Sequence, residues 1–117
     1  AQTGIKSLDV TIDCDNLDAR ELGTMGIPAR FDLCNIEGFE DTNGTMHPAE
    51  DVREAISALG FPIEDAVKDK PSIRLKIDKM FTGLLTGFPG NNNFILTVTE
   101  NNGLSTTKTL KYYVPAN

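Results

Sequence analysis

The sequence predicts a mainly β fold, an antiparallel two-sheet β-sandwich with one α-helix inserted at about residues 48–59. Short segments in which every second residue is apolar are typical of strands with one buried face. These segments occur near both ends of the chain, and they do not alternate with helices as the strands of a parallel α/β sheet do. An antiparallel sandwich with the helix placed after the second strand therefore accounts for this order.

A β-hairpin over residues 91–115 is the most regular of these segments. Apolar residues recur at every second position from Phe94 to Val98, and Asn101-Asn102-Gly103 separates them from a second β-rich segment. A loop made of all three turn residues sets Phe94 opposite Leu110 and keeps both apolar sets on one face. A two-residue turn would place the apolar residues of the second strand on the wrong face. The predicted loop is a type I turn followed by a glycine in the left-handed region.

The same register predicts the composition of the two hairpin faces. Val98 lies opposite Thr106, and Leu96 lies opposite Lys108, which is the one poor match. On the other face threonine and serine pairs oppose each other, which favours a solvated sheet surface. Five side chains are expected to share one apolar layer, namely Phe94, Leu96, Val98, Leu110 and Tyr112. Tyr113 is expected to point outward.

Three further strands are predicted, over residues 8–14, 27–33 and 72–79. The first alternates apolar residues with aspartate and threonine. In the second, Ala29, Phe31 and Leu33 lie on one side and Arg30 and Asp32 on the other. In the third, Ile73, Leu75 and Ile77 share a face. Residues 80–85 break the alternation and are expected to plug the end of the sandwich with Phe81, Leu84 and Leu85, before a turn at residues 87–91.

The predicted helix has both of its ends marked in the sequence. Pro48 is a good first helical residue, and the acids that follow it suit the positive N-terminal end. An apolar stripe at the helical spacing comprises Val52, Ala55, Ile56 and Leu59. Gly60 stands at the expected C-terminal glycine position, and Pro62 prevents the helix from resuming. A helix of about 12 residues is marginal alone in water, so the stripe must dock on the sheet or cap one end of it.

The remaining segments are less regular. Residues 15–26 could form either a short helix or an irregular crossing, and the sequence does not decide between the two. Residues 37–46 are predicted to form a loop rich in turn residues, above all Asn43-Gly44, and residues 61–70 a connector.

The net charge of −6 is unevenly distributed. Residues 1–65 carry 14 acidic and 4 basic side chains, a net charge of −10, whereas residues 66–117 carry 3 acidic and 7 basic side chains, a net charge of +4. The two halves either neutralise each other within one fold or present a basic strip on the outer sheet face to an acidic neighbour. Nucleic acid is not expected as a partner, because the pI is about 4.6 and no basic-aromatic cluster is present.

The chain length and the hydropathy pattern limit the number of domains and the classes of protein to which the chain can belong. A chain of 117 residues is one domain of ordinary size, with enough core to fold without disulfides or metals. No apolar run approaches the ~18–20 residues that span a bilayer, so membrane insertion by this domain is not expected. Residues 1–4 look like the cut edge of a longer chain or a mature N-terminus. We therefore expect residues 1–117 to be a single domain excised from a longer protein.

Residues 94–109 resemble the closing hairpin of immunoglobulin-like modules of bacterial surface proteins, among them the PKD and cadherin-like groups, in their aliphatic-Thr-Val-Thr strand, acid, Asn-Gly turn and Thr-rich return strand. A longer pattern over residues 58–62, 67–70, 73–78, 84–85, 89–90 and 94 resembles uncharacterised domains in lipid-anchored surface proteins of gut bacteria. The Trp-Asp-Phe-Gly-Asp-Gly stretch of PKD modules is absent, as are the Trp and the paired cysteines of antibody-type domains. The resemblance implies an immunoglobulin-like sandwich in a protein exported to the cell surface or extracellular space.

Cys14 and Cys34 are the two cysteines of the chain. Cys14 lies on the inward parity of its strand, whereas Cys34 lies on the opposite parity from Leu33. Partners across adjacent strands must share a face, so this geometry argues against a disulfide, although a bulge near Cys34 would reverse the argument. The pairing stays open. Metal binding by the two cysteines and His47 is not expected at these spacings.

No hydrolase, zinc-protease, dinucleotide or phosphate-loop motif is present, so we predict no catalytic residue and no cofactor. His47 is interpreted as a solvated residue at the start of the helix. Two groups of oxygen ligands could bind calcium, although neither has the EF-hand order; they are Asp13, Asp15, Asn16 and Asp18, and Glu40, Asp41 and Asn43. An enzyme would need a carboxylate pair, for which the candidates are Glu37, Glu40 and Asp41.

The predicted function is therefore that of a non-catalytic structural or protein-interaction module, whose partners are other domains of the same chain or surface proteins. The alternative is a carbohydrate-binding module on the same scaffold. Sugar rings stack on aromatic side chains, and without Trp the candidates are Phe39, Phe61, Phe88 and Tyr113. A shallow aromatic patch near Tyr113 or Phe88 is the predicted ligand contact.

Overall fold

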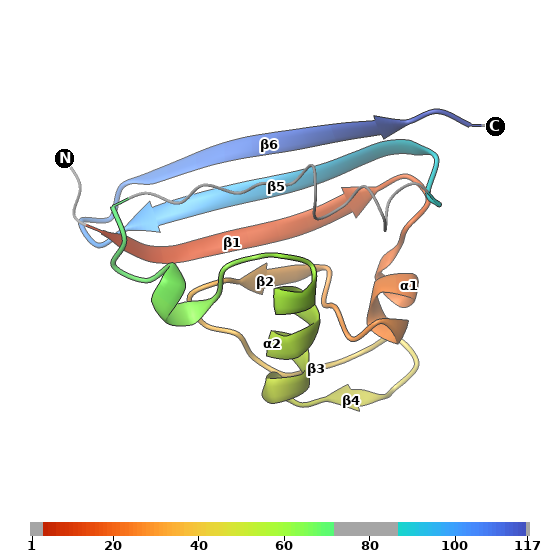
Figure 1. The fold of residues 1–117 in the computed structure, drawn as a ribbon, viewed down its shortest axis with the longest axis horizontal. Coiled ribbons are helices and arrows are strands. Elements are labelled where there is room, and N and C mark those ends of the chain that lie inside the picture. The colour runs from red at the N-terminus through yellow and green to blue at the C-terminus, as the bar shows by residue number, and fades with distance from the viewer. Residues whose placement is uncertain (1–3, 72–86, 117) are drawn as a thin grey trace.

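The centre of the computed structural model, which describes residues 4–71 and 87–116, is an antiparallel four-stranded sheet. Its strands follow the order β2 (Arg30–Asp32), β1 (Ile5–Cys14), β5 (Gly90–Glu100) and β6 (Ser105–Val114). A second, two-stranded sheet pairs β3 (Phe39–Glu40) with β4 (Met46–His47). Helix α2 (Ala49–Ala58) and the small sheet lie together on the β2 side of the large sheet (Figure 1). This confirms the mainly β, antiparallel fold with a helix inserted after the second strand, and it is compatible with the predicted sandwich.

The hairpin of β5 and β6 has the predicted register. Phe94 pairs with Leu110, and Val98 pairs with Thr106. Gly103 has a φ of +92°, and its N–H donates to the carbonyl of Glu100 at 2.9 Å. The loop is therefore the three-residue turn with a left-handed glycine that the parity of the strands requires.

The predicted apolar layer of the hairpin is also confirmed. Phe94 and Leu96 are buried, and the other three members, Val98, Leu110 and Tyr112, pack partly buried against the same core. On the opposite face, the hydroxyls of Thr97 and Thr107 lie 3.1 Å apart and share a hydrogen bond.

Strand β1 lies between β2 and β5 and supplies the centre of the core. Its predicted alternation is confirmed, because Leu8, Val10 and Ile12 are buried. Buried side chains from the sheet, the helices and the connectors form one hydrophobic cluster. Complete burial of one valine, leucine, isoleucine or phenylalanine side chain contributes roughly 1.5–3 kcal/mol to the free energy of unfolding. This cluster is therefore the main source of stability.

Helix α2 has the predicted position and docks by the predicted stripe. Val52 and Ile56 are completely buried, and Ala55 and Leu59 pack partly buried on the same core. Pro48 is the N-cap rather than the first helical residue. Gly60 follows the helix with a φ of +96°, the left-handed conformation that commonly ends helices.

The open question over residues 15–26 is resolved by a second, shorter helix, α1 (Ala19–Thr24). The Asp18 side chain caps it by accepting the Glu21 N–H at 2.9 Å. Asp is among the preferred N-cap residues because its oxygen satisfies an N–H that the first turn leaves without a partner. Leu22 is buried and ties the helix to the core.

Several predicted boundaries need correction. β1 begins at Ile5 rather than at residue 8. β2 covers three residues rather than 27–33, although backbone bonds to β1 continue on both sides of it, from Ile12 to Ala29 and from Leu33 to Leu8. The predicted loop at 37–46 contains strand β3 and the start of β4, because its turn is tight enough to bring the flanking backbone into register.

The connector over residues 61–70 is anchored at several points. It contains the 3-10 turn η1 (Glu64–Ala66) and buries Phe61 and Val67. Near its end, the Asp69 N–H donates to the Ile5 carbonyl at 2.8 Å. The predicted strand at 72–79 and the predicted plug at 80–85 lie outside the described residues. The predicted turn at 87–91 is shorter than expected, since β5 already begins at Gly90.

The chain enters the large sheet at one end and leaves it at the other. Ile5, the first residue of β1, pairs with Glu100 at the end of β5, whereas Val114, the last residue of β6, pairs with Gly90 at the start of β5. β5 has 11 residues, and ten steps of about 3.3 Å separate the two points by roughly 33 Å. Figure 1 shows the start of β1 and the end of β6 on opposite sides of the molecule. Within the described residues no helix is long and apolar enough to cross a membrane.

Candidate functional site

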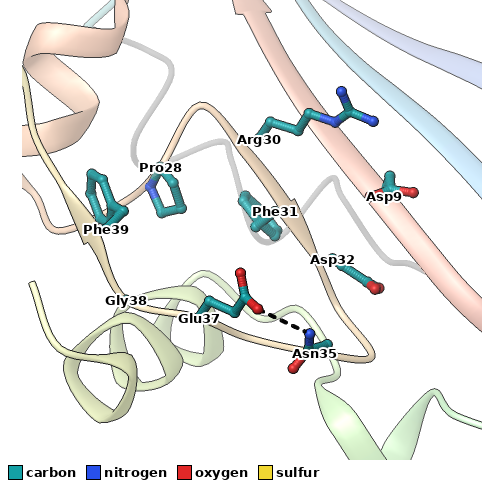
Figure 2. A pocket seen from close by; sticks show the side chains of 9 residues that line it. All are labelled: Asp9, Pro28, Arg30, Phe31, Asp32, Asn35, Glu37, Gly38 and Phe39. Atoms are coloured by element: carbon teal, nitrogen blue, oxygen red, sulfur yellow. Dashed lines mark hydrogen bonds between the residues drawn. The ribbon is translucent and has the colours of Figure 1, made fainter.

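A groove of about 380 Å³ opens beside β2. It is lined by residues from β1, from β2 and its flanks, and from the segment that leads into β3; they are Asp9, Pro28, Arg30, Phe31, Asp32, Asn35, Glu37, Gly38 and Phe39. Figure 2 shows these side chains, with Phe39 and Pro28 at one end of the groove and Asp9 and the Arg30 guanidinium at the other.

The register of β1 and β2 places the charged residues of the groove. Asp9 lies directly opposite Asp32, and Thr11 lies opposite Arg30. These are the outward positions of both strands, since Val10 and the Phe31 side chain between them are buried. Two carboxylates directly opposite each other in a sheet repel, so the groove contains a like-charge pair at its β1 end.

Asp32 has a structural role as well as a place in the groove. One of its carboxylate oxygens, Oδ1, accepts the Leu8 N–H at 3.0 Å and the Cys34 N–H at 2.9 Å. These bonds tie the end of β2 to β1, and Oδ2 has no hydrogen-bond partner among the described residues. Next to Asp32, the Asn35 amide donates to Glu37 Oε1 at 3.3 Å.

The aromatic residues of the groove are held by neighbouring rings. Phe39 stacks on the His47 ring, with centroids 4.9 Å apart and an interplanar angle of 17°. Phe31 meets Phe61 edge to face at 5.7 Å. Because these contacts fix both rings, the apolar wall of the groove is preformed.

Asp41 organises the turn between β3 and β4. Its Oδ1 accepts the N–H groups of Asn43 and Thr45 at 2.9 and 3.0 Å, and its Oδ2 lies 2.8 Å from His47 Nε2. The hydrogen bond from His47, followed by those from the backbone, lowers the pKa of Asp41 below its usual value. Only 4% of the Asp41 side chain is exposed. Its oxygens are therefore occupied by the protein itself.

His47 differs from its predicted role. It is not a solvated residue at the helix start, because 18% of its side chain is exposed and it bonds Asp41 while stacking on Phe39. Sequence reasoning missed this pair because the two residues stand at the ends of a turn whose closure could not be seen from spacing alone.

The residues of the first predicted calcium group also hold parts of the backbone together. Asp15 Oδ2 accepts the Asn91 N–H at 2.8 Å, Asp18 caps α1, and the Asn16 amide donates to the Pro89 carbonyl. Within residues 4–71 and 87–116, no three His, Cys, Asp or Glu side chains are grouped so that they could hold a metal ion.

The three carboxylates that were the candidates for an enzyme lie in different environments. Glu37 lines the groove, Asp41 is engaged in its own turn, and Glu40 is exposed in β3. The groove instead combines Glu37 with Asp9 and Asp32, which the sequence marked only as outward residues of their strands.

Both cysteines are free thiols. The Leu33 N–H donates to the Leu8 carbonyl beside β2, so Cys34 lies near Ser7, about seven residues or roughly 23 Å along β1 from Cys14. This separation excludes a disulfide within the chain. Burial raises the pKa of Cys14 to about 11 and also raises the pKa of Cys34.

The two predicted ligand contacts lie at the same end of the hairpin but in different settings. Tyr113 is 65% exposed on β6, opposite Asn91. Phe88 is partly buried against the hydrophobic core, and its carbonyl accepts the Asn92 amide at 3.2 Å. Tyr113 is thus the accessible ring of the two.

Comparison with known proteins adds no relative. No family model, no curated protein and no solved structure matches the chain. The groove, the sheet and the exposed tyrosine are therefore the features from which function is argued.

Proposed function

We propose that this chain is a non-catalytic structural or protein-interaction module of an exported bacterial surface protein. The observation that carries the proposal is the path of the chain, which enters the sheet beside Glu100 and leaves it beside Gly90. A module with this path adds its full length to a string of domains. β1 and β6 also run parallel with β5 between them, so a pull on the two ends loads both ladders of β5 in shear.

The use of the acidic side chains supports the non-catalytic part of the proposal. Asp15, Asp18 and Asp41 all accept backbone N–H groups. A carboxylate whose oxygen atoms accept nearby backbone N–H groups serves to stabilise the fold. The export part rests on the resemblance of residues 94–109 to the closing hairpin of bacterial surface modules.

The length-adding role is tested with a tandem protein of three copies studied by small-angle X-ray scattering. The longest principal extent of one domain is 45 Å, and we expect the maximum dimension to grow by about that amount, plus the linker, with each added copy. A growth of less than half of this value would mean that the modules fold back, and it would remove the spacer role.

Export is tested on intact cells of the source organism. Brief treatment with trypsin, followed by mass spectrometry of the released peptides, is expected to yield peptides of residues 1–117 from intact cells. Peptides that appear only after lysis would contradict export. The complete open reading frame provides an independent check, since a lipobox upstream of residue 1 is expected.

A carbohydrate-binding module is the second candidate, favoured by Tyr113, an aromatic ring that is 65% exposed beside the polar side chain of Asn91. The test is a glycan array followed by calorimetry of any hit with the Tyr113→Ala variant. Leu104→Ala, at an equally exposed apolar residue of the hairpin turn, is the control. Absence of binding on the array would remove this candidate.

A further inference from the structure

We propose that the groove beside β2 is the docking site for a basic side chain, arginine or lysine, presented by a partner protein. The proposal names the partner chemistry of the interaction module proposed above, and it rests on that function. It uses three properties of the groove, namely its charge, its apolar wall and its size.

The charge of the groove favours a cation. Its lining contains three carboxylates, Asp9, Asp32 and Glu37, and one guanidinium, that of Arg30. Glu37 receives a single hydrogen bond from the described residues, a long one from Asn35, and Asp32 keeps one oxygen without a partner there. Arg30 forms no ion pair within residues 4–71 and 87–116, and its guanidinium extends toward β1 in Figure 2. The end of the groove around Glu37 therefore carries uncompensated negative charge.

The apolar wall selects a cation with an aliphatic stem. Phe39 and Pro28 line the same end of the groove, and the Glu37 side chain lies between that end and Asn35 in Figure 2. Arginine and lysine pack their methylene stems along apolar surface while their charged heads remain at polar groups. A stem against Phe39 and Pro28 would bring its head to the Glu37 carboxylate. A bare metal ion would not use this wall, and the described residues offer no cluster of three metal ligands.

The size of the groove is consistent with a side chain from a protein. Its volume of about 380 Å³ is at the lower end of the range for pockets that hold small ligands. The surrounding charge adds a longer-range preference, since residues 1–65 have a net charge of −10. Such a surface attracts a basic partner and accelerates its association.

The test is an NMR titration of the ¹⁵N-labelled domain with N-acetyl-arginine methylamide. We expect saturable shifts of the backbone amides of Asn35, Glu37 and Gly38, and weaker binding when the salt is raised from about 0.05 M to about 0.5 M. The citrulline analogue, which has the same shape without the charge, is expected to give no saturable shifts. Methyl glucoside is titrated in parallel.

Matched variants locate the site. Glu37→Gln is expected to raise the Kd roughly two- to fivefold, the range for one exposed ion pair, while retaining the oxygen that accepts from Asn35. Glu40→Gln makes the same charge change at an exposed residue outside the groove and is expected to leave the Kd unchanged. Both positions are exposed, so both variants are expected to fold.

Three outcomes overturn the proposal: no saturable shifts with the arginine probe or with methyl glucoside, equal effects of the two variants, or shifts caused by methyl glucoside but not by the arginine probe. The last would make the groove a polyol site. None of these results bears on the tandem scattering experiment. A module that extends a string of domains but ignores the arginine probe would retain the proposed function and lose only this inference.

Discussion

In the hairpin of the large sheet, backbone groups pair with one another along both strands, whereas in residues 15–47 several backbone N–H groups are accepted by aspartate side chains. The β5–β6 ladder runs without interruption from Gly90 to Thr99. In the irregular region, Asp18 caps a helix, Asp32 binds two N–H groups beside β2, and Asp41 binds two more in its turn. Part of the charge asymmetry of the chain is therefore structural, because aspartate is the shortest acidic side chain and readily accepts such groups locally.

The largest expected effect lies in the regular region. Phe94→Ala should lower the free energy of unfolding by about 3–5 kcal/mol, since Phe94 is 1% exposed in the core and its removal leaves a cavity. Urea unfolding measures this loss. Ile95→Ala, on the outer face of the same strand, is the control and should cost roughly 1 kcal/mol. Equal losses at both positions would contradict the one-sided burial of the hairpin.

The junction between the two regions is tested by glycine substitutions. Gly90 has a φ of +104°, and a Cβ there would lie 2.8 Å from Asp15 Oδ2, so Gly90→Ala should cost about 2–4 kcal/mol. Gly103 has a φ of +92° but open space around it, so Gly103→Ala should cost only the backbone strain of about 1–2 kcal/mol.

Gly87→Ala completes this series as its control. Gly87 has no neighbour within 4 Å and no positive φ, and its substitution should change stability by less than about 0.5 kcal/mol. Chemical denaturation of the three variants should rank them in this order. A Gly90→Ala protein as stable as Gly103→Ala would show that the contact with Asp15 is unimportant.

The irregular region should respond to acid through Asp41. Because its pKa is lowered in the folded state, Asp41 contributes stability above its ordinary pKa of 3.8, and this contribution is lost as the pH falls through the lowered value. Thermal unfolding between pH 2 and 6 should show that Asp41→Asn has a lower Tm than the wild type near pH 6 and a smaller further loss in acid. Glu40→Gln is the control, and a parallel acid response in the wild type and Asp41→Asn would refute the role of Asp41.

The smallest effect is expected at the cysteines. A reductant should leave the Tm unchanged, because both thiols are free. The raised pKa of Cys14, about 11 against an ordinary 9.0, means that the folded state holds its proton more tightly, so this contribution to stability is present below pH 9 and lost as the pH rises through about 11. Alkylation by iodoacetamide near pH 8 should be much slower in the folded than in the urea-unfolded protein. A fall in Tm with reductant would show a disulfide.

The sequence was sufficient for those parts of the fold in which a local period decides the structure. The hairpin register follows from the parity of its apolar residues and from the three-residue turn, and the span of α2 follows from its stripe and its terminal glycine. In both, near neighbours in the chain determine which face is buried.

The groove and the Asp41–His47 pair depend on contacts that no local period encodes. Asp9 and Asp32 stand 23 positions apart and meet only because β1 and β2 pair. Phe39 lines the same groove as residues of β1 and β2 only because the chain folds back after β2. A residue with an outward position on a strand can face solvent, a neighbour or a ligand, and the alternation of apolar and polar residues is the same in all three. The pairing of distant segments decides among them.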